Sequence, residues 1–192
     1  SDLVQCQTGE DVTSYMDTDY QPLAYTTFSP EGAREETRSF VPASVAEFVV
    51  FDLAAKGGEV AVAGAVVVRD AEGVIAYYPP SPGSSERMTP YDGYVAVLGR
   101  VSGVARFERT VDGGGRADHF SALRWTDDGL LAVGASGWDR WHGGKSISRG
   151  AGLLMALVSL DGAEARVRSV PLDGSARHFH LLGVDARAGE VV

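Results

Sequence analysis

Apolar and polar residues alternate along most of the chain, and this pattern predicts strands rather than helices. In Val104–Val111 apolar and polar residues alternate with a period near two, as in a half-buried strand. Leu130–Ala135 is apolar and small throughout, which indicates a strand covered on both faces. Ala43–Leu53 also fits a short helix, but it aligns with a later predicted strand, so we expect a strand there.

Asp-Gly pairs separate these segments and predict tight turns. Asp and Gly readily adopt the backbone angles that hairpins require. Among the turns expected on this ground is a hairpin at Gly113–Gly115. The pairs stand at Asp112-Gly113, Asp128-Gly129, Asp161-Gly162 and Asp173-Gly174.

The chain contains an internal repeat. Tyr94–Leu98 resembles Leu153–Val158, His119 has its counterpart 59 positions later in His178, and Gly129 has its counterpart 60 positions later in Gly189. Phe48–Gly64 is a partial earlier copy of the segment that ends at Gly134, at an offset of about 71 or 72 positions. The complete unit is expected to hold four strands: Tyr94–Leu98, Val104–Thr110, His119–Trp125 and Leu130–Ala135.

Four strands in a repeat of this length are typical of a β-propeller blade. One such unit cannot bury its apolar faces alone, so neighbouring copies must stack. We therefore expect an all-β fold, with residues 1–192 forming one domain that is a β-propeller or part of one. It would have four-stranded antiparallel blades, about three in this chain, with residues 79–90 as a Pro- and Ser-rich insertion loop.

Over about residues 45–192 the chain resembles a bacterial β-propeller repeat family found in large secreted and envelope proteins. The resemblance implies a secreted or cell-envelope location. It rests on turn and strand residues, so it implies an architecture and no reaction. The residues that carry it are Tyr91–Leu98, Asp112–Gly114, Asp118, Asp128-Gly129 and Ala132–Gly134.

The last residues, 189–192, resemble the start of a fourth strand, whereas the earlier copies of that strand continue to Gly64 and Gly134. A strand cut there would leave backbone groups unpaired, and a closed propeller uses ~4–8 blades. We therefore expect the remainder of the propeller to come from a downstream segment, a cleaved partner chain or a second subunit. The alternative is an open stack of three units.

The composition narrows the range of partners. A net charge of −9 argues against binding nucleic acid. Cys6 is the single cysteine, so no disulfide can form within the chain, and Gln5 fits a lipid-attachment site poorly. The longest apolar stretch, Val60–Val68, is too short to span a membrane.

One loop concentrates groups suited to recognition. Its two indoles can stack on a sugar ring or anchor a protein partner, and its charged residues can bind hydroxyl groups or pair with each other. The alternative is that the indoles cover the end of the core. We predict a ligand-binding site for a protein or glycan at Trp138, Asp139, Arg140, Trp141 and His142.

Three histidines are weak candidates for a metal site: His119, His178 and His180. Their recurrence in the repeat favours a packing role instead, so we predict neither a metal nor a cofactor. No nucleophile elbow or phosphate-binding glycine loop is recognisable.

The sequence therefore favours a non-catalytic binding or scaffold module. One alternative is a propeller hydrolase or lyase acting on a polysaccharide, with acid–base groups from Glu86-Arg87 and the Trp138–His142 loop. A second alternative is a purely structural repeat.

Overall fold

The computed structural model describes residues 3–7, 23–29, 31–40, 42, 45–68, 91–113, 118–136, 152–171, 186–187 and 190–191. Every regular element in these residues is a β-strand, so the all-β prediction is confirmed. The strand over 45–56 also confirms that Ala43–Leu53 is not helical where it is described. The predicted insertion loop, 79–90, lies outside the described residues.

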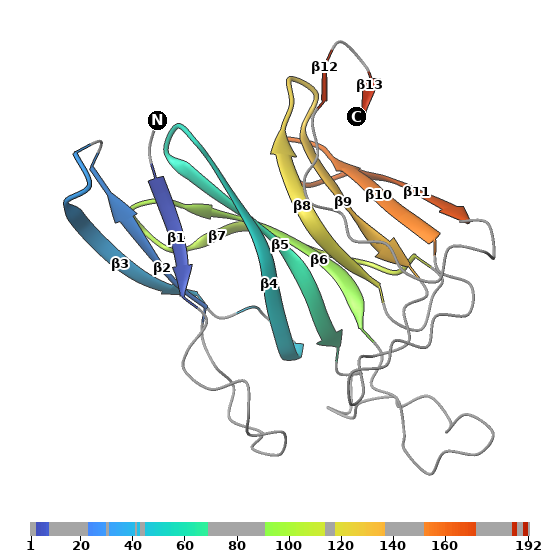
Figure 1. Cartoon of the computed structure of the whole chain (residues 1–192). Coiled ribbons are helices and arrows are strands. Elements are labelled where there is room, and N and C mark those ends of the chain that lie inside the picture. Colours follow the sequence, from blue (N-terminus) through green and yellow to red (C-terminus); the bar gives the residue numbers. More distant parts are fainter. Residues whose placement is uncertain are drawn as a thin grey trace.

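The strands form four antiparallel sheets in chain order, each a meander of sequence neighbours (Figure 1). The three-stranded sheet contains β1 (Leu3–Gln7), β2 (Leu23–Phe28) and β3 (Arg34–Phe40). The first four-stranded sheet contains β4 (Val45–Lys56), β5 (Glu59–Val68), β6 (Asp92–Gly99) and β7 (Ala105–Val111). The second contains β8 (His119–Trp125), β9 (Leu130–Ser136), β10 (Gly152–Val158) and β11 (Ala165–Pro171). A short hairpin of β12 (Ala186–Arg187) and β13 (Glu190–Val191) follows.

The two four-stranded sheets share one irregularity at the same place in their first strand. A β-bulge interrupts β4 between Val50 and Asp52, and another interrupts β8 between Phe120 and Ala122. Opposite these bulges stand Gly64 and Gly134. A Cβ on either glycine would overlap a carbonyl oxygen of the bulged strand, so only glycine fits. The shared bulge and its glycine confirm the partial copy in the backbone pairing, with Gly64 and Gly134 70 positions apart instead of about 71 or 72. The predicted counterparts His178 and Gly189 lie outside the described residues.

The boundaries of the repeat unit differ from the prediction. The expected unit joined the strands now labelled β6 to β9, but β6 and β7 end one sheet, whereas β8 and β9 begin the next. β7 and β8 therefore do not pair as the hairpin predicted at Gly113–Gly115 requires, and Gly114 and Gly115 lie outside the described residues. A repeat gives its period in the sequence but not its starting point, which explains the error.

The predicted count of about three four-stranded blades is also wrong. The described residues form two four-stranded sheets, preceded by a three-stranded sheet and followed by the β12–β13 hairpin. The three-stranded sheet matches the last three strands of the other two. Its pairing of Leu23 with Phe40 corresponds to that of Gly93 with Val111 and of Leu153 with Val170.

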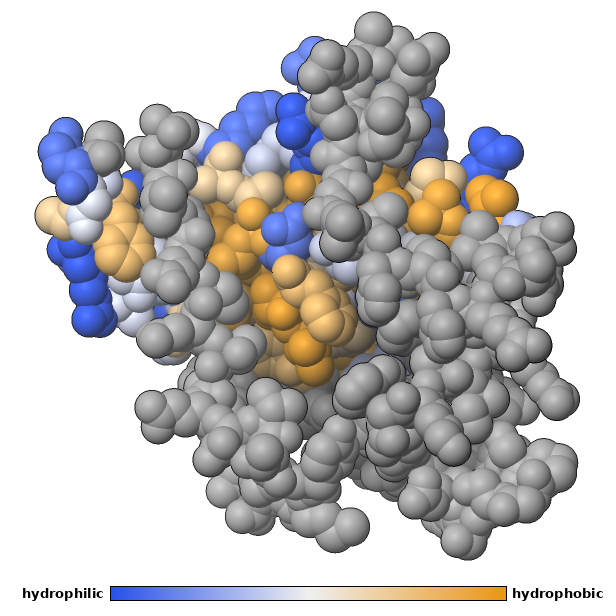
Figure 2. Space-filling view, in the orientation of Figure 1, coloured by the Kyte–Doolittle hydropathy of each residue, from blue (hydrophilic) through white to orange (hydrophobic). Residues whose placement is uncertain are grey.

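Successive sheets pack through the two faces of the middle sheet. Alternate residues of β5 point to opposite sides, so Val60 and Val62 pack towards the three-stranded sheet. Ala61 and Ala63 pack towards the second four-stranded sheet. Each fully buried Val or Leu stabilises the fold by about 1.5–3 kcal/mol. On the face seen in Figure 2, apolar side chains gather at the centre, over β4 and β5, whereas hydrophilic ones line the edge at β3.

Two hydrogen bonds tie β8 to β4 where these sheets meet. The amide N–H of Leu123 donates to Oδ2 of Asp52 at 2.7 Å. The indole Nε1–H of Trp125 donates to the carbonyl oxygen of Ala54 at 3.1 Å. The Asp52 carboxylate thereby accepts a hydrogen bond from a backbone amide next to the bulge of β8. The two bonds together fix the position of β8 relative to β4.

Candidate functional site

Most of the residues singled out in the sequence lie outside the described part of the chain. These are the loop residues Trp138, Asp139, Arg140, Trp141 and His142 and the histidines His178 and His180. Of the predicted candidates, His119 is described, at the start of β8. Its ring lies 5.4 Å from that of Phe51, the extra residue in the bulge of β4. Burial lowers the pKa of His119, and the neighbouring Asp118 opposes that shift.

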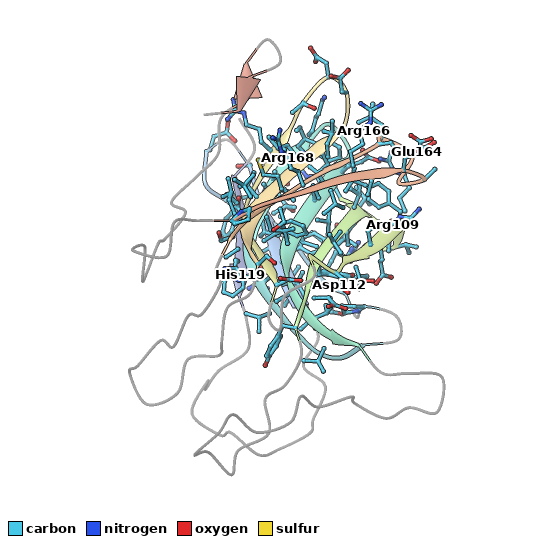
Figure 3. The ribbon with its side chains drawn as sticks, turned by 90° about the vertical axis from the view of Figure 1, so that its right-hand side faces the viewer. Arg109, Asp112, His119, Glu164, Arg166 and Arg168 are labelled. Atoms are coloured by element: carbon cyan, nitrogen blue, oxygen red, sulfur yellow. The ribbon has the colours of Figure 1, made fainter. Side chains whose placement is uncertain are left out.

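The structure instead brings together three aspartates at one end of the two four-stranded sheets. A carboxylate oxygen from each of Asp92, Asp112 and Asp118 lies within 4.8 Å of the others. Asp118 is fully buried, Asp92 is partly buried and Asp112 is exposed. Figure 3 shows Asp112 and His119 at the same end of the molecule. We call these three residues the aspartate cluster.

Strand pairing places the members of the cluster. Asp92 begins β6 and Asp112 follows β7, and these strands pair through Gly93 and Val111, so the two aspartates flank the last pair of the ladder. Asp118 precedes β8, and its amide donates to the carbonyl oxygen of Tyr91 at 2.7 Å. The chain is thereby drawn back to the start of β6 as it enters the next sheet.

Gly113 fixes the buried carboxylate of the cluster. Its amide donates to Oδ2 of Asp118 at 2.6 Å. A Cβ on Gly113 would lie 2.9 Å from Leu154, 3.0 Å from Oγ of Ser136 and 3.1 Å from the same Asp118 oxygen. A Cβ at this point would therefore force one or more of these side chains to shift, which favours glycine at position 113.

Burial and the neighbouring carboxylates raise the proton affinity of Asp92. The pKa of Asp92 is raised from 3.8 to about 6, first because the carboxyl is partly removed from water, then because Asp112 and Asp118 lie nearby. Such a group can accept and release a proton in the mildly acidic range. When ionised, three clustered carboxylates also offer the oxygen ligands that divalent cations such as Ca²⁺ prefer.

Sequence reasoning missed this cluster because it assigned Asp112 to a local turn and used Asp92 and Asp118 only as residues of the repeat pattern. The signal was present in the repeat: Asp92 and Asp112 flank two strands that were predicted to be neighbours, and Asp118 directly precedes the next strand. Their convergence depends on two separate sheets meeting at that point. Pairing between β6 and β7 was expected, whereas the approach of β8 from another sheet was not.

Comparison with known proteins gives no relative for this chain: no family model, no curated protein and no solved structure matches it. In the described residues, no helix combines the length and apolar character needed to cross a lipid bilayer.

Proposed function

We propose that this chain is a non-catalytic scaffold and binding module of the β-propeller type. The observation that carries the proposal is the succession of antiparallel meanders with matching registers, in which the middle sheet buries both faces against its neighbours. A stack of equivalent four-stranded sheets is the way a propeller is assembled. On this proposal the sheets hold the connecting loops in place and perform no chemistry.

The proposed partner is a protein or a glycan outside the cytoplasm, recognised through loops at one face of the stack. This part of the proposal is supported by the sequence of the Trp138–His142 loop and by the resemblance to secreted repeat proteins. Tryptophan and arginine supply large contact areas at interfaces. A net charge of −9 favours a partner that is neutral or basic.

A glycan array, run with a matched panel of basic and neutral peptides, tests the proposal. We expect the wild-type chain to bind a subset of probes and Trp141→Ala to lose that binding. Trp125→Phe, which removes the indole that bonds β8 to β4, is the control and should bind normally. Equal binding by wild type and Trp141→Ala, or binding to none of the probes, would count against the recognition role.

A second candidate function is a hydrolase or lyase acting on a polysaccharide. The observation in its favour is the aspartate cluster, where Asp92, with a pKa of about 6, lies beside two further carboxylates. One protonated and one ionised carboxyl group are what acid–base cleavage of a glycosidic bond requires. Reducing-end assays on acidic and neutral polysaccharides decide between the two functions. Turnover that Asp92→Asn abolishes would favour the enzyme, whereas binding without turnover favours the scaffold.

A further inference from the structure

The sheets are connected by a joint that recurs along the stack. The strand pair that ends each sheet is joined by a short turn, and each turn is closed by a hydrogen bond from its first amide to its last carbonyl oxygen. These bonds measure 2.8 Å in the first sheet and 2.9 Å in the next two. Each turn also contains a glycine with positive φ, namely Gly32 (86°), Gly103 (68°) and Gly162 (73°). The turns are Ser29–Ala33, of which Pro30 lies outside the described residues, Gly99–Val104 and Ser159–Glu164.

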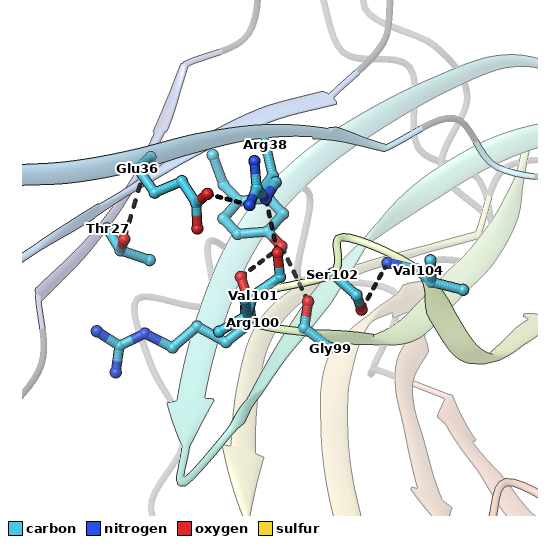
Figure 4. A network of polar contacts seen from close by, with 9 residues as sticks. Thr27, Glu36, Arg38, Gly99, Arg100, Val101, Ser102 and Val104 are labelled. Atoms are coloured by element: carbon cyan, nitrogen blue, oxygen red, sulfur yellow. Dashed lines mark hydrogen bonds and ion pairs between the residues drawn. The ribbon is translucent and has the colours of Figure 1, made fainter.

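The first joint holds the Gly99–Val104 turn against the three-stranded sheet (Figure 4). Nε of Arg38, on β3, donates to the carbonyl oxygen of Val101 at 2.6 Å. The hydroxyl of Tyr25, which pairs with Arg38 across the strands, donates to the carbonyl oxygens of Gly99 and Arg100 at 3.1 Å. An arginine on the last strand of one sheet therefore binds the backbone of the next sheet's turn.

The second joint repeats this arrangement one sheet further on. Nε of Arg109, on β7, donates to the carbonyl oxygen of Gly162 at 2.6 Å, and its Nη2 donates to that of Ala163 at 2.9 Å. The turn lies so close to β7 that a Cβ on Gly162 would overlap the ring of Phe107. Arg38 and Arg109 occupy equivalent ladder positions, since each stands two residues before the apolar residue, Phe40 or Val111, that closes its sheet.

Arg168 occupies the same ladder position in the third sheet. It pairs with Met155, as Arg109 pairs with Val95 and Arg38 with Tyr25. β11 is the edge strand of its sheet, and Arg168 is exposed on it (Figure 3). Unlike Arg38 and Arg109, it bonds to no turn of the described chain.

At the opposite end of the stack, one turn of the same kind is open. Gly103 and Gly162 each face the last strand of the preceding sheet, whereas nothing lies within 4 Å of a Cβ built on Gly32. Glu31, beside it, is exposed and carries the charge opposite to that of Arg168. Within the described chain, Arg168 is thus an arginine that binds no turn, and Ser29–Ala33 is a turn that no arginine binds. The contact that would join them is the one that Arg38 and Arg109 already make.

We propose that Arg168 binds the Ser29–Ala33 turn of a second copy of this chain, so that molecules associate head to tail; this inference rests on the proposed stacking of equivalent sheets. The two surfaces in this contact differ from each other, so each molecule keeps one of them free for a further copy. Repeating the contact therefore gives a closed ring or an open chain of copies. The outer side of the three-stranded sheet is polar there, with the hydroxyls of Thr26 and Thr37 2.9 Å apart. Hydrogen bonds and charge contribute more than apolar area, so the association depends on protein concentration.

Sedimentation velocity over a concentration series tests the inference. We expect the weight-average sedimentation coefficient of the wild-type chain to rise with concentration, and Arg168→Ala to weaken the association about tenfold, as for loss of a charged hydrogen bond. Lys56→Ala removes the same charge from the exposed end of β4 in the middle sheet, and should leave the association close to wild type. A chain that is monomeric at every concentration overturns the inference, as does association that Arg168→Ala leaves unchanged.

Cross-linking identifies the two surfaces. In a Cys6→Ser background, Ala33→Cys and Ser169→Cys are made as separate proteins and treated with a short bismaleimide. Mixing them should give a dimer that links position 33 to position 169, and neither protein alone should give as much. Equal yields from the separate proteins would overturn the inference. The proposed scaffold role would survive that result, because it depends on stacking within one chain and is tested by ligand binding.

Discussion

Replacing Asp92 by asparagine should stabilise the protein above pH 6 and leave it unchanged near pH 4. A carboxyl group whose pKa is raised by folding opposes folding once it ionises. The pKa of Asp92 is about 6 in the folded chain against 3.8 ordinarily, so stability is lost as the pH rises through this interval. Asparagine carries no charge at any of these pH values and removes the loss.

The magnitude follows from the shift. Each pKa unit corresponds to about 1.4 kcal/mol, so the full shift is worth about 3 kcal/mol. Asp92 is only partly buried, and water screens its repulsion from Asp112 and Asp118. We therefore expect a gain of about 1–2 kcal/mol in the free energy of unfolding at pH 7.5.

Urea unfolding followed by tryptophan fluorescence, at several pH values between 4 and 8, measures this gain. Asp128→Asn is the matched control: it removes the same charge from an exposed turn and should give a small difference. A gain for Asp92→Asn that is equally large at pH 4, or a loss of stability at pH 7.5, would refute the explanation by burial and repulsion.

Three further substitutions test the packing between strands and sheets. Gly134→Ala places a Cβ on the carbonyl oxygen of His119, so chemical denaturation should show a loss of about 2–3 kcal/mol. Trp125→Phe leaves the carbonyl oxygen of Ala54 without its donor, and should cost about 1–2 kcal/mol in the same assay. Arg109→Ala releases the β10–β11 turn from β7, and hydrogen exchange at the amides of that turn should speed up at least several-fold, with little change at β5.

The strands and their spacing could be predicted because short-range patterns determine them. Alternation in Val104–Val111 and the apolar run at Leu130–Ala135 place β7 and β9 within a residue or so of their observed bounds. The glycines at 64 and 134 also stood out in the repeat, and each proves to lie opposite a bulge.

The grouping of strands into sheets could not be predicted in the same way. The sequence contains β6, β7, β8 and β9 in a row, and a unit drawn anywhere along that row has the same period. The division falls between β7 and β8 because Asp118 and Gly113 lead the chain out of one sheet and into the next. The hydrogen bond from Gly113 to Asp118 joins two residues that, from the sequence alone, fit local turns equally well.

The aspartate cluster and the arginine joints were beyond sequence reasoning for a related reason. Each needs two sheets to be placed against each other before its members meet. Arg38, Arg109 and Arg168 are separated by unequal intervals and lie in strands of different composition. Their equivalence becomes visible only when each is located by its partner across the ladder.

The central claim is that two equivalent four-stranded meanders, β4–β7 and β8–β11, stack on each other. Backbone nuclear Overhauser contacts measured by NMR test it most directly. We expect cross-strand contacts between Val62 and Ala96 and between Ala132 and Ala156, together with a contact from the Trp125 indole to Ala54. Backbone contacts that pair β7 with β8, which would make a single sheet of β6 to β9, would contradict the claim.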